Sequence, residues 1–223
     1  MTKVKICGLK SYQDISFVNE LLPDYIGFVL AKSKRQIDFE QAKRLKRLLD
    51  DRIKAVGVFV NAEMVEICAF EGIIDLVQLH GDESEEYIAR LKEACRMPII
   101  KAIRVGANFN TKDLRETSAD YSLFDTASKD AFGGTGEVFD WGKLEQPGSH
   151  MDLESCFLAG GICAGNALSA IETLRPYCLD VSSSVETDGR KDFEKIKSFI
   201  DIVRGKSARE NSKVLGEMKE GKV

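Results

Sequence analysis

A cysteine and an aspartate each stand at the carboxyl end of a predicted strand. Cys7 ends the apolar segment 3–7 and precedes a glycine, and Asp125 follows the apolar segment 121–124. A thiolate can remove a proton from carbon while a carboxylic acid delivers one to oxygen, so the pair suits general acid–base chemistry. The thiol then needs a nearby positive group, whereas the carboxyl needs burial or an anionic neighbour to stay protonated. The alternatives are that Cys7 only fills the core and that Asp125 only caps a turn.

Four other polar side chains are candidate substrate contacts. Arg35 ends the basic cluster 32–35, and its guanidinium could grip a carboxylate through two parallel hydrogen bonds, although such a cluster can also be a solvated loop. Gln78 and His80 end another predicted strand, and one histidine without a second ligand does not predict a metal site. Asp180 lies between two apolar strand residues, where its charge needs a partner. That partner is either the substrate or a structural hydrogen bond.

Small residues follow the last two predicted strands. In the segments 159–162 and 181–186, backbone N–H groups can approach an anion closely, and barrel enzymes bind phosphate at these two loops. The predicted phosphate contacts are Gly160, Gly161, Ser182, Ser183 and Ser184. A third glycine-rich segment, 132–136, lacks the lysine of a P-loop. We therefore expect either a lid over the substrate or a surface loop there, and no nucleotide site.

Eight short apolar segments alternate with amphipathic stretches that have helical spacing. Many of these segments are apolar at consecutive positions, as expected of parallel strands that are covered on both faces. This pattern predicts a (β/α)₈ barrel as a single domain over residues 1–205, with an open doubly wound sheet as the alternative. The long connections 31–38 and 126–140 would then lie at the carboxyl-terminal face of the barrel, where sites are built. The predicted strands are 3–7, 25–30, 54–60, 76–79, 99–103, 121–124, 156–159 and 179–182.

The composition excludes several classes of function. The 223 residues include no apolar run of about 20 residues, which a membrane span would need. A net charge of −4 gives no basic footprint for nucleic acid. No secretory signal opens the chain, and the six cysteines show no C-x-x-C spacing, so we expect a cytoplasmic protein without structural zinc or disulfides. The tail 206–223 is charged and poor in apolar residues, and no function is assigned to it.

Six segments, in chain order, resemble the phosphoribosylanthranilate isomerase family of tryptophan biosynthesis. The resemblance covers nearly the whole chain except the tail, and it implies a (β/α)₈ barrel that works without cofactor or metal. It also implies an Amadori rearrangement of N-(5-phosphoribosyl)anthranilate to 1-(2-carboxyphenylamino)-1-deoxyribulose 5-phosphate. The matching segments are Lys5-Ile6-Cys7-Gly8-Leu9, Ser33-Lys34-Arg35, Val77-Gln78-Leu79-His80-Gly81, Gly133-Gly134-Thr135-Gly136 with Phe139-Asp140-Trp141, Ala159-Gly160-Gly161 and Asp180-Val181-Ser182-Ser183.

The resemblance implies a role for each matching residue. Asp125 corresponds to the acid that protonates the ribose ring oxygen, and Cys7 to the base that removes the C2 proton. Arg35 corresponds to the group that binds the anthranilate carboxylate, and Asp180 to a residue near the anthranilate nitrogen. The phosphate-binding backbone corresponds to Gly161, Ser182, Ser183 and their neighbours.

Two departures from the family pattern bear on phosphate binding. Ser184 stands where the family usually has a glycine, and serine resists the positive φ that glycine allows. Either the turn never needs positive φ or phosphate binding is altered. After Gly161, residues 163–166 (Cys-Ala-Gly-Asn) replace the usual helix start with a less obvious cap, which could loosen the entry to that helix.

Two other functions fit parts of the same pattern. A catalytically idle phosphate-binding barrel could act as a regulator, but it would not need an acid and a base together. A different sugar-phosphate isomerase, such as one acting on a histidine-pathway aminoketose, tends to pair two aspartates where this chain has Cys7 and Asp125. The thiol therefore favours the anthranilate enzyme. A monomer and a homodimer are both compatible with the sequence.

Overall fold

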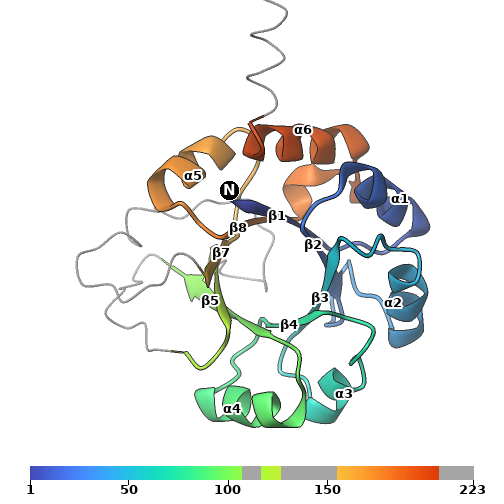
Figure 1. The fold of residues 1–223 in the computed structure, drawn as a ribbon, viewed down its shortest axis with the longest axis vertical. Coiled ribbons are helices and arrows are strands. Elements are labelled where there is room, and N and C mark those ends of the chain that lie inside the picture. Colours follow the sequence, from blue (N-terminus) through green and yellow to red (C-terminus); the bar gives the residue numbers. More distant parts are fainter. Residues whose placement is uncertain (107–116, 127–154, 206–223) are drawn as a thin grey trace, which may run out of the picture.

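The computed structural model describes residues 1–106, 117–126 and 155–205. Eight parallel strands follow one another in chain order and close into a barrel, with helices around the outside (Figure 1). The predicted (β/α)₈ barrel is confirmed. Within these residues, no helix has the length and apolar character that a membrane span would need. The predicted lid 132–136, most of the connection 126–140 and the tail 206–223 lie outside the described residues.

The strands agree closely with the segments predicted from the sequence. The largest differences are at β5 and β6, which extend two residues further because their pairing continues through Arg104 with Asp125 and Val105 with Thr126. Asp125 is therefore held inside a paired strand and does not belong to a loop. The strands are β1 (Lys3–Cys7), β2 (Tyr25–Val29), β3 (Lys54–Phe59), β4 (Leu76–Leu79), β5 (Ile99–Val105), β6 (Tyr121–Thr126), β7 (Cys156–Leu158) and β8 (Cys178–Val181).

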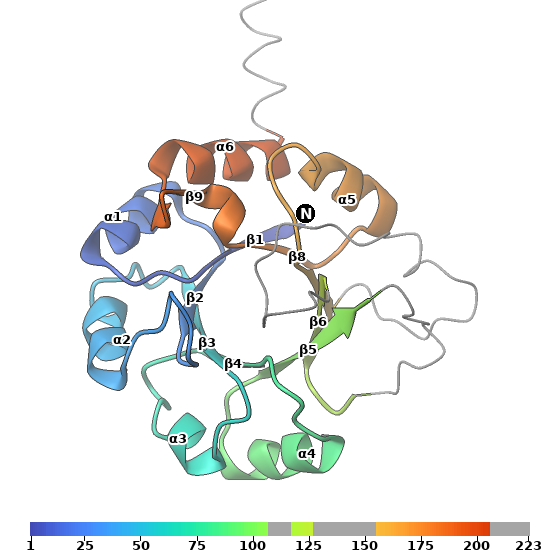
Figure 2. The ribbon, with the colours of Figure 1, turned by 180° about the vertical axis from the view of Figure 1, so that it is seen from behind.

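Side-chain caps begin most of the helices that surround the barrel. Ser11 and Asp14 form a reciprocal capping box at α1, and Asp38, Ser84 and Asp192 cap α2, α4 and α6. Figure 2 shows the same ring of helices from the opposite end of the barrel. The described helices are α1 (Tyr12–Leu21), α2 (Phe39–Lys46), α3 (Met64–Cys68), α4 (Glu85–Ala94), α5 (Ala167–Leu174) and α6 (Phe193–Val203).

The apolar core has two layers. One layer lies between the helices and the outer faces of the strands, and it includes Val4 and Ile6 of β1. The other layer fills one end of the barrel interior, where the buried ring of Phe157 packs edge-on against Tyr25 and Tyr121. The barrel is therefore solid at this end, and a pocket can open only toward the carboxyl ends of the strands.

A short hairpin after β8 was not predicted from the sequence. Its strands, β9 (Glu186–Thr187) and β10 (Arg190–Lys191), are antiparallel and are joined by Asp188 and Gly189. Both joining residues have positive φ (51° and 73°), the geometry that makes Asp-Gly a strong two-residue hairpin signal. The dipeptide is visible in the sequence and could have revealed the hairpin.

The interior aromatic layer yields a test of the core. We expect Phe157→Ala to lower the free energy of unfolding by about 3–5 kcal/mol, because the surrounding rings cannot collapse into the space. Urea denaturation followed by circular dichroism measures the loss. Tyr12→Ala is the matched control, since Tyr12 is 60% exposed and should change stability by less than about 0.5 kcal/mol. Equal losses in the two variants would contradict the placement of Phe157 in the core.

Candidate active site

A pocket of about 350 Å³ opens at the carboxyl ends of the strands. It is lined by residues of β1, β2, β3, β4, β6 and β8 and by the segments that follow β2, β3, β4, β7 and β8. Every residue that the sequence analysis singled out for catalysis or binding lines it. They are Cys7, Arg35, Gln78, His80, Asp125, Gly160, Gly161, Asp180, Ser182, Ser183 and Ser184.

Cys7 is the last residue of β1 and reaches the pocket over a glycine of the neighbouring strand. A Cβ at Gly27 of β2 would lie 2.6 Å from the Cys7 Sγ, so only glycine leaves room for the thiol. Burial raises the pKa of the Cys7 thiol, and Asp180 adds to this, while the Lys5 and Lys191 ammonium groups act in the opposite direction. The positive neighbours expected from the sequence are present, but burial outweighs them.

Lys5 is a site residue that the sequence analysis did not identify. Its side chain is fully buried, and its Nζ donates to Asp180 Oδ2 at 2.6 Å and to Gln78 Oε1 at 2.8 Å. Burial disfavours the charged amine, but Asp180 and then Cys7 outweigh it and raise the pKa of Lys5. Side chains alternate between the two faces of a strand, so Lys5 and Cys7 lie on the same face of β1. This alternation could have identified Lys5 as a site residue from the sequence.

Asp180 of β8 presents one oxygen to Lys5 and keeps the other available. Lys5 and Asp180 are direct neighbours in the pairing of β1 with β8. Among the described residues, the buried Oδ1 of Asp180 has no hydrogen-bond partner. Burial raises the pKa of this carboxyl, against the pull of Lys5. A buried acceptor that lines a pocket in this way suits a donor on a ligand.

His80 links Gln78 to Asp125. The Gln78 Nε2 lies 2.9 Å from His80 Nδ1, and His80 Nε2 lies 3.2 Å from Asp125 Oδ2. With the bonds of Lys5, a continuous chain of polar contacts therefore runs across the pocket floor, from Asp180 of β8 to Asp125 of β6. The sequence placed Gln78, His80, Asp125 and Asp180 at one rim, but it did not reveal Lys5 or the bonds that join these side chains.

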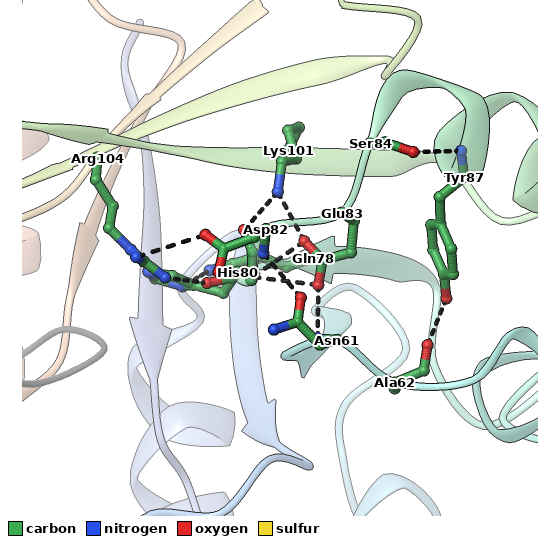
Figure 3. A network of polar contacts seen from close by, with 11 residues as sticks. Asn61, Ala62, Gln78, His80, Asp82, Glu83, Ser84, Tyr87, Lys101 and Arg104 are labelled. Atoms are coloured by element: carbon green, nitrogen blue, oxygen red, sulfur yellow. Dashed lines mark hydrogen bonds and ion pairs between the residues drawn. The ribbon is translucent and has the colours of Figure 1, made fainter.

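An ion pair fixes the backbone that follows His80. Lys101 of β5 donates to Glu83 Oε2 and to the Gly81 carbonyl, both at 2.7 Å, and the Glu83 side chain is only 2% exposed (Figure 3). Glu83 also accepts the backbone N–H of Asn61 at 2.8 Å, which ties this loop to the one after β3. The histidine therefore stands on a rigid loop.

Arg35 binds a carboxylate in two parallel hydrogen bonds, and that carboxylate belongs to the protein. Its Nε and Nη2 donate to the Oε1 and Oε2 of Glu186 at 2.7 and 2.8 Å. Gly8, with φ of +84°, makes room for this arginine, because a Cβ there would lie 2.4 Å from Arg35 Cδ. The sequence predicted the mode of binding, but it did not predict Glu186 as the partner.

A second cation shares the same carboxylate. Lys191 of β10 donates to Glu186 Oε1 at 2.8 Å and to the Ser182 carbonyl at 3.0 Å. Burial would raise the pKa of Glu186, but the hydrogen bonds from Arg35 and Lys191 lower it to about 2. Both Glu186 and Lys191 were missed because they depend on the unpredicted hairpin.

Two glycines form the opposite wall of the pocket. Gly160 and Gly161 have φ of +74° and +71°, and a Cβ at Gly160 would lie 2.3 Å from the backbone nitrogen of Thr126. No other residue fits at Gly160 without a shift of β6. No group of three or more histidine, cysteine or acidic side chains that could hold a metal occurs in the described ranges.

Comparison with known proteins identifies the family of this chain. The family model described as N-(5'phosphoribosyl)anthranilate (PRA) isomerase matches residues 4–202. A protein of Endomicrobium trichonymphae named N-(5'-phosphoribosyl)anthranilate isomerase is 48% identical over 207 residues, which are 92% of this chain and 99% of the relative. This chain belongs to the N-(5'-phosphoribosyl)anthranilate isomerase family.

Two solved structures of the isomerase family match the fold. One is described as mutually generated monomers of the dimeric isomerase from Thermotoga maritima, with a TM-score of 0.76 and 35% sequence identity. The other is an isomerase in complex with reduced 1-(o-carboxyphenylamino)-1-deoxyribulose 5-phosphate, with a TM-score of 0.74 and 35% sequence identity. Each match covers 92% of this chain and 100% of the other.

The unusual helix start of this isomerase-family chain is held by an asparagine. Asn166 Oδ1 accepts the backbone N–H of Cys163 at 2.8 Å, and its Nδ2 donates to the Gly161 carbonyl at 2.9 Å. The side chain fixes the loop before α5 and makes no cap bond to the helix itself. Residues 163–166 therefore hold the Gly160–Gly161 wall in place, while the helix itself begins without a side-chain cap bond.

Ser184 does not require the backbone conformation of the usual family glycine. It lies in a 3-10 turn, Ser183–Val185, and is not among the residues with positive φ. In this chain the turn therefore does not need positive φ at Ser184. Within the described residues, the buried Ser184 Oγ has no hydrogen-bond partner, although the residue lines the pocket.

The low pKa of Glu186 predicts how stability depends on pH. Because the folded pKa of about 2 lies below the usual 4.5, the carboxylate contributes stability above pH 4.5 and loses it as the pH falls toward 2. We expect Glu186→Gln to lower the free energy of unfolding at pH 7 and to flatten its fall between pH 4.5 and 2. Denaturant titrations across this range measure the effect, with Glu194→Gln as the control, because Glu194 is an exposed residue of α6.

Proposed function

We propose that this chain catalyses the Amadori rearrangement of N-(5'-phosphoribosyl)anthranilate to 1-(2-carboxyphenylamino)-1-deoxyribulose 5-phosphate. The observation that carries the proposal is that Cys7 and Asp125, from β1 and β6, line one pocket together with the small-residue loops after β7 and β8. A base, an acid and a candidate phosphate cradle are thus available to one small molecule.

The pocket offers a partner for each end of the substrate. The sugar phosphate would lie against the Gly160–Gly161 backbone and the turn 182–184, where N–H groups and hydroxyls can reach its oxygens. The anthranilate carboxylate would lie at the guanidinium edge of Arg35 that Glu186 leaves unused. The Asp180 Oδ1 would accept the substrate N–H.

The two catalytic groups act in sequence. Protonated Asp125 gives its proton to the ribose ring oxygen, the bond from C1 to that oxygen breaks, and the nitrogen lone pair forms an iminium. The Cys7 thiolate then takes the C2 proton, and the released electron pair neutralises the iminium to give an enolamine. Proton gain at C1 and loss from the C2 hydroxyl give the ketone.

The raised thiol pKa of Cys7 is compatible with its role as the base. Burial favours the protonated thiol, while Lys5 and Lys191 already oppose that effect. An iminium beside the thiol adds a positive charge that favours the thiolate, and it also makes the C2 proton acidic. The base is therefore generated when the substrate ring opens.

The sequence predicts a cytoplasmic protein without nucleic acid or membrane partners, and we keep those predictions.

A homodimer is one of the two states compatible with the sequence, and the Thermotoga maritima relative is described as dimeric. We infer that this chain also forms a homodimer. Sedimentation velocity of the full chain would test the inference, and a monomer at all concentrations would contradict it.

Turnover of freshly prepared phosphoribosylanthranilate tests the function directly. We expect the wild-type chain to convert it, and Cys7→Ala and Asp125→Ala each to lower kcat by at least about 1,000-fold, because each removes a group that moves a proton. The loss of anthranilate fluorescence measures the rate. Cys68→Ser on α3, outside the pocket, controls for thiol removal. An active double variant, or a wild type that binds a product analogue without turnover, would overturn the proposal.

The buried hydroxyl of Ser184 has no hydrogen-bond partner among the described residues, so we expect it to form an additional contact with the phosphate. A hydrogen bond to a charged group is worth about 1.5–3 kcal/mol, so we expect Ser184→Gly to raise KM about tenfold or more with little change in kcat. Inhibition by inorganic phosphate should weaken in parallel, and Ser184→Thr, which keeps the hydroxyl, should restore it. Unchanged phosphate inhibition in the glycine variant would show that the hydroxyl makes no such contact.

A further inference from the structure

The chain of hydrogen bonds across the pocket floor has a fixed direction. It joins five side chains, four of them from β8, β1, β4 and β6 and the fifth from His80 after β4, with Asp180 at one end and Asp125 at the other. The heavy-atom distances along it are 2.6 Å from Lys5 to Asp180, 2.8 Å from Lys5 to Gln78, 2.9 Å from Gln78 to His80 and 3.2 Å from His80 to Asp125. All four are within hydrogen-bonding range.

Lys5 determines which way the Gln78 amide faces. An ammonium group can only donate, so the atom of Gln78 that meets Lys5 must be the carbonyl oxygen. Asp180, at 2.6 Å, keeps Lys5 in this charged form although the amine is fully buried. The amide nitrogen of Gln78 is thereby turned toward His80.

The amide in turn determines where His80 carries its proton. The Gln78 Nε2 can only donate, so the His80 Nδ1 that faces it must have a lone pair. The imidazole proton is then on Nε2, and it donates to Asp125 Oδ2. A doubly protonated ring would place an N–H against the amide NH₂, and turning the amide would place its NH₂ against Lys5. Either change breaks a buried hydrogen bond.

We propose that Lys5 is a positioning residue which, through Gln78, holds His80 as its Nε2–H tautomer and so keeps the transferable proton of Asp125 on Oδ1. Oδ2 accepts from His80, which leaves Oδ1 as the oxygen that can carry a proton. Oδ1 lies toward Gly160, since a Cβ on that glycine would come within 2.8 Å of it. The opposite tautomer would present a lone pair to Asp125 and compete for its proton.

The same hydrogen bond serves Asp125 after the proton has left. The His80 Nε2–H can then stabilise the carboxylate that forms, in a site where Asp125 is only 6% exposed. This inference deepens the proposed function, because its catalytic consequence rests on Asp125 acting as the acid. The tautomer itself follows from the contacts alone.

Nitrogen-15 NMR of histidine-labelled full-length protein tests the tautomer. The chain has two histidines, and His150→Gln assigns the signals of His80. Long-range proton–nitrogen correlations at neutral pH distinguish the two tautomers and the charged ring. We expect the wild type to show the Nε2–H pattern. An Nδ1–H pattern or a doubly protonated ring in the wild type would overturn the proposal.

Variants at the two controlling positions test the cause. Gln78→Glu places an acceptor opposite Nδ1, so we expect the proton to move there, giving an Nδ1–H or a doubly protonated ring. Lys5→Met should let the Gln78 amide turn and give signals of both tautomers. If that variant does not fold because Asp180 is left unpaired, Lys5→Met with Asp180→Asn removes both charges and should give the same mixture. An unchanged Nε2–H pattern in Gln78→Glu would refute the proposal.

Steady-state kinetics of the same variants separate this proposal from the proposed function. If both are correct, Gln78→Glu should lower kcat about 100-fold with KM changed by less than about threefold, because proton transfer and not binding is affected. If the tautomer moves as expected but the wild type does not turn over phosphoribosylanthranilate, the function is wrong and the positioning role stands. If turnover is normal and the tautomer does not move, only the positioning role is wrong.

Discussion

The buried ion pair between Lys5 and Asp180 is the interaction on which the pocket depends. Each charge would be costly to bury alone, and breaking such a pair commonly costs about 3–5 kcal/mol because one charge is left without a partner. The pair lies where β1 and β8 meet and close the barrel, and Lys5 reaches from there to Gln78 of β4. It therefore ties the closing strands to the pocket floor and fixes the polar side chains that stand on it.

The first strand shows how one short segment can serve both the core and the site. Val4 and Ile6 face outward into the apolar layer beneath the helices, where both are fully buried. Lys5 and Cys7 face inward, toward Asp180 and the pocket. The period of two along a strand separates these tasks, so a change of register by one residue would exchange them. The aromatic layer around Phe157 fills the other end of the barrel. The inward-facing polar groups can therefore be reached only from the carboxyl ends of the strands.

The sequence predicted the fold and the membership of the pocket better than the contacts inside it. In a parallel barrel all carboxyl ends of strands share one rim, so Cys7 and Asp125 could be brought together without knowing any side-chain geometry. Lys5 was missed because a charged residue within a strand reveals its partner only through the register of β1 with β8. The partner of Arg35 was missed because Glu186 is presented by the turn and hairpin after β8. Predicting it required the Asp-Gly signal at residues 188 and 189.

The charges around Arg35 indicate how the pocket can bind two anionic groups at opposite ends. Lys5 is neutralised by Asp180, whereas Arg35 and Lys191 share the single carboxylate of Glu186. Among the buried and half-buried groups, this cluster keeps one positive charge in excess, which matches the one carboxylate of an anthranilate ring. No comparable cation lines the Gly160–Gly161 wall among the described residues. Backbone N–H groups and the hydroxyls of the turn 182–184 are the groups by which this side of the pocket can bind an anion, and Asn166 holds the Gly161 carbonyl in place.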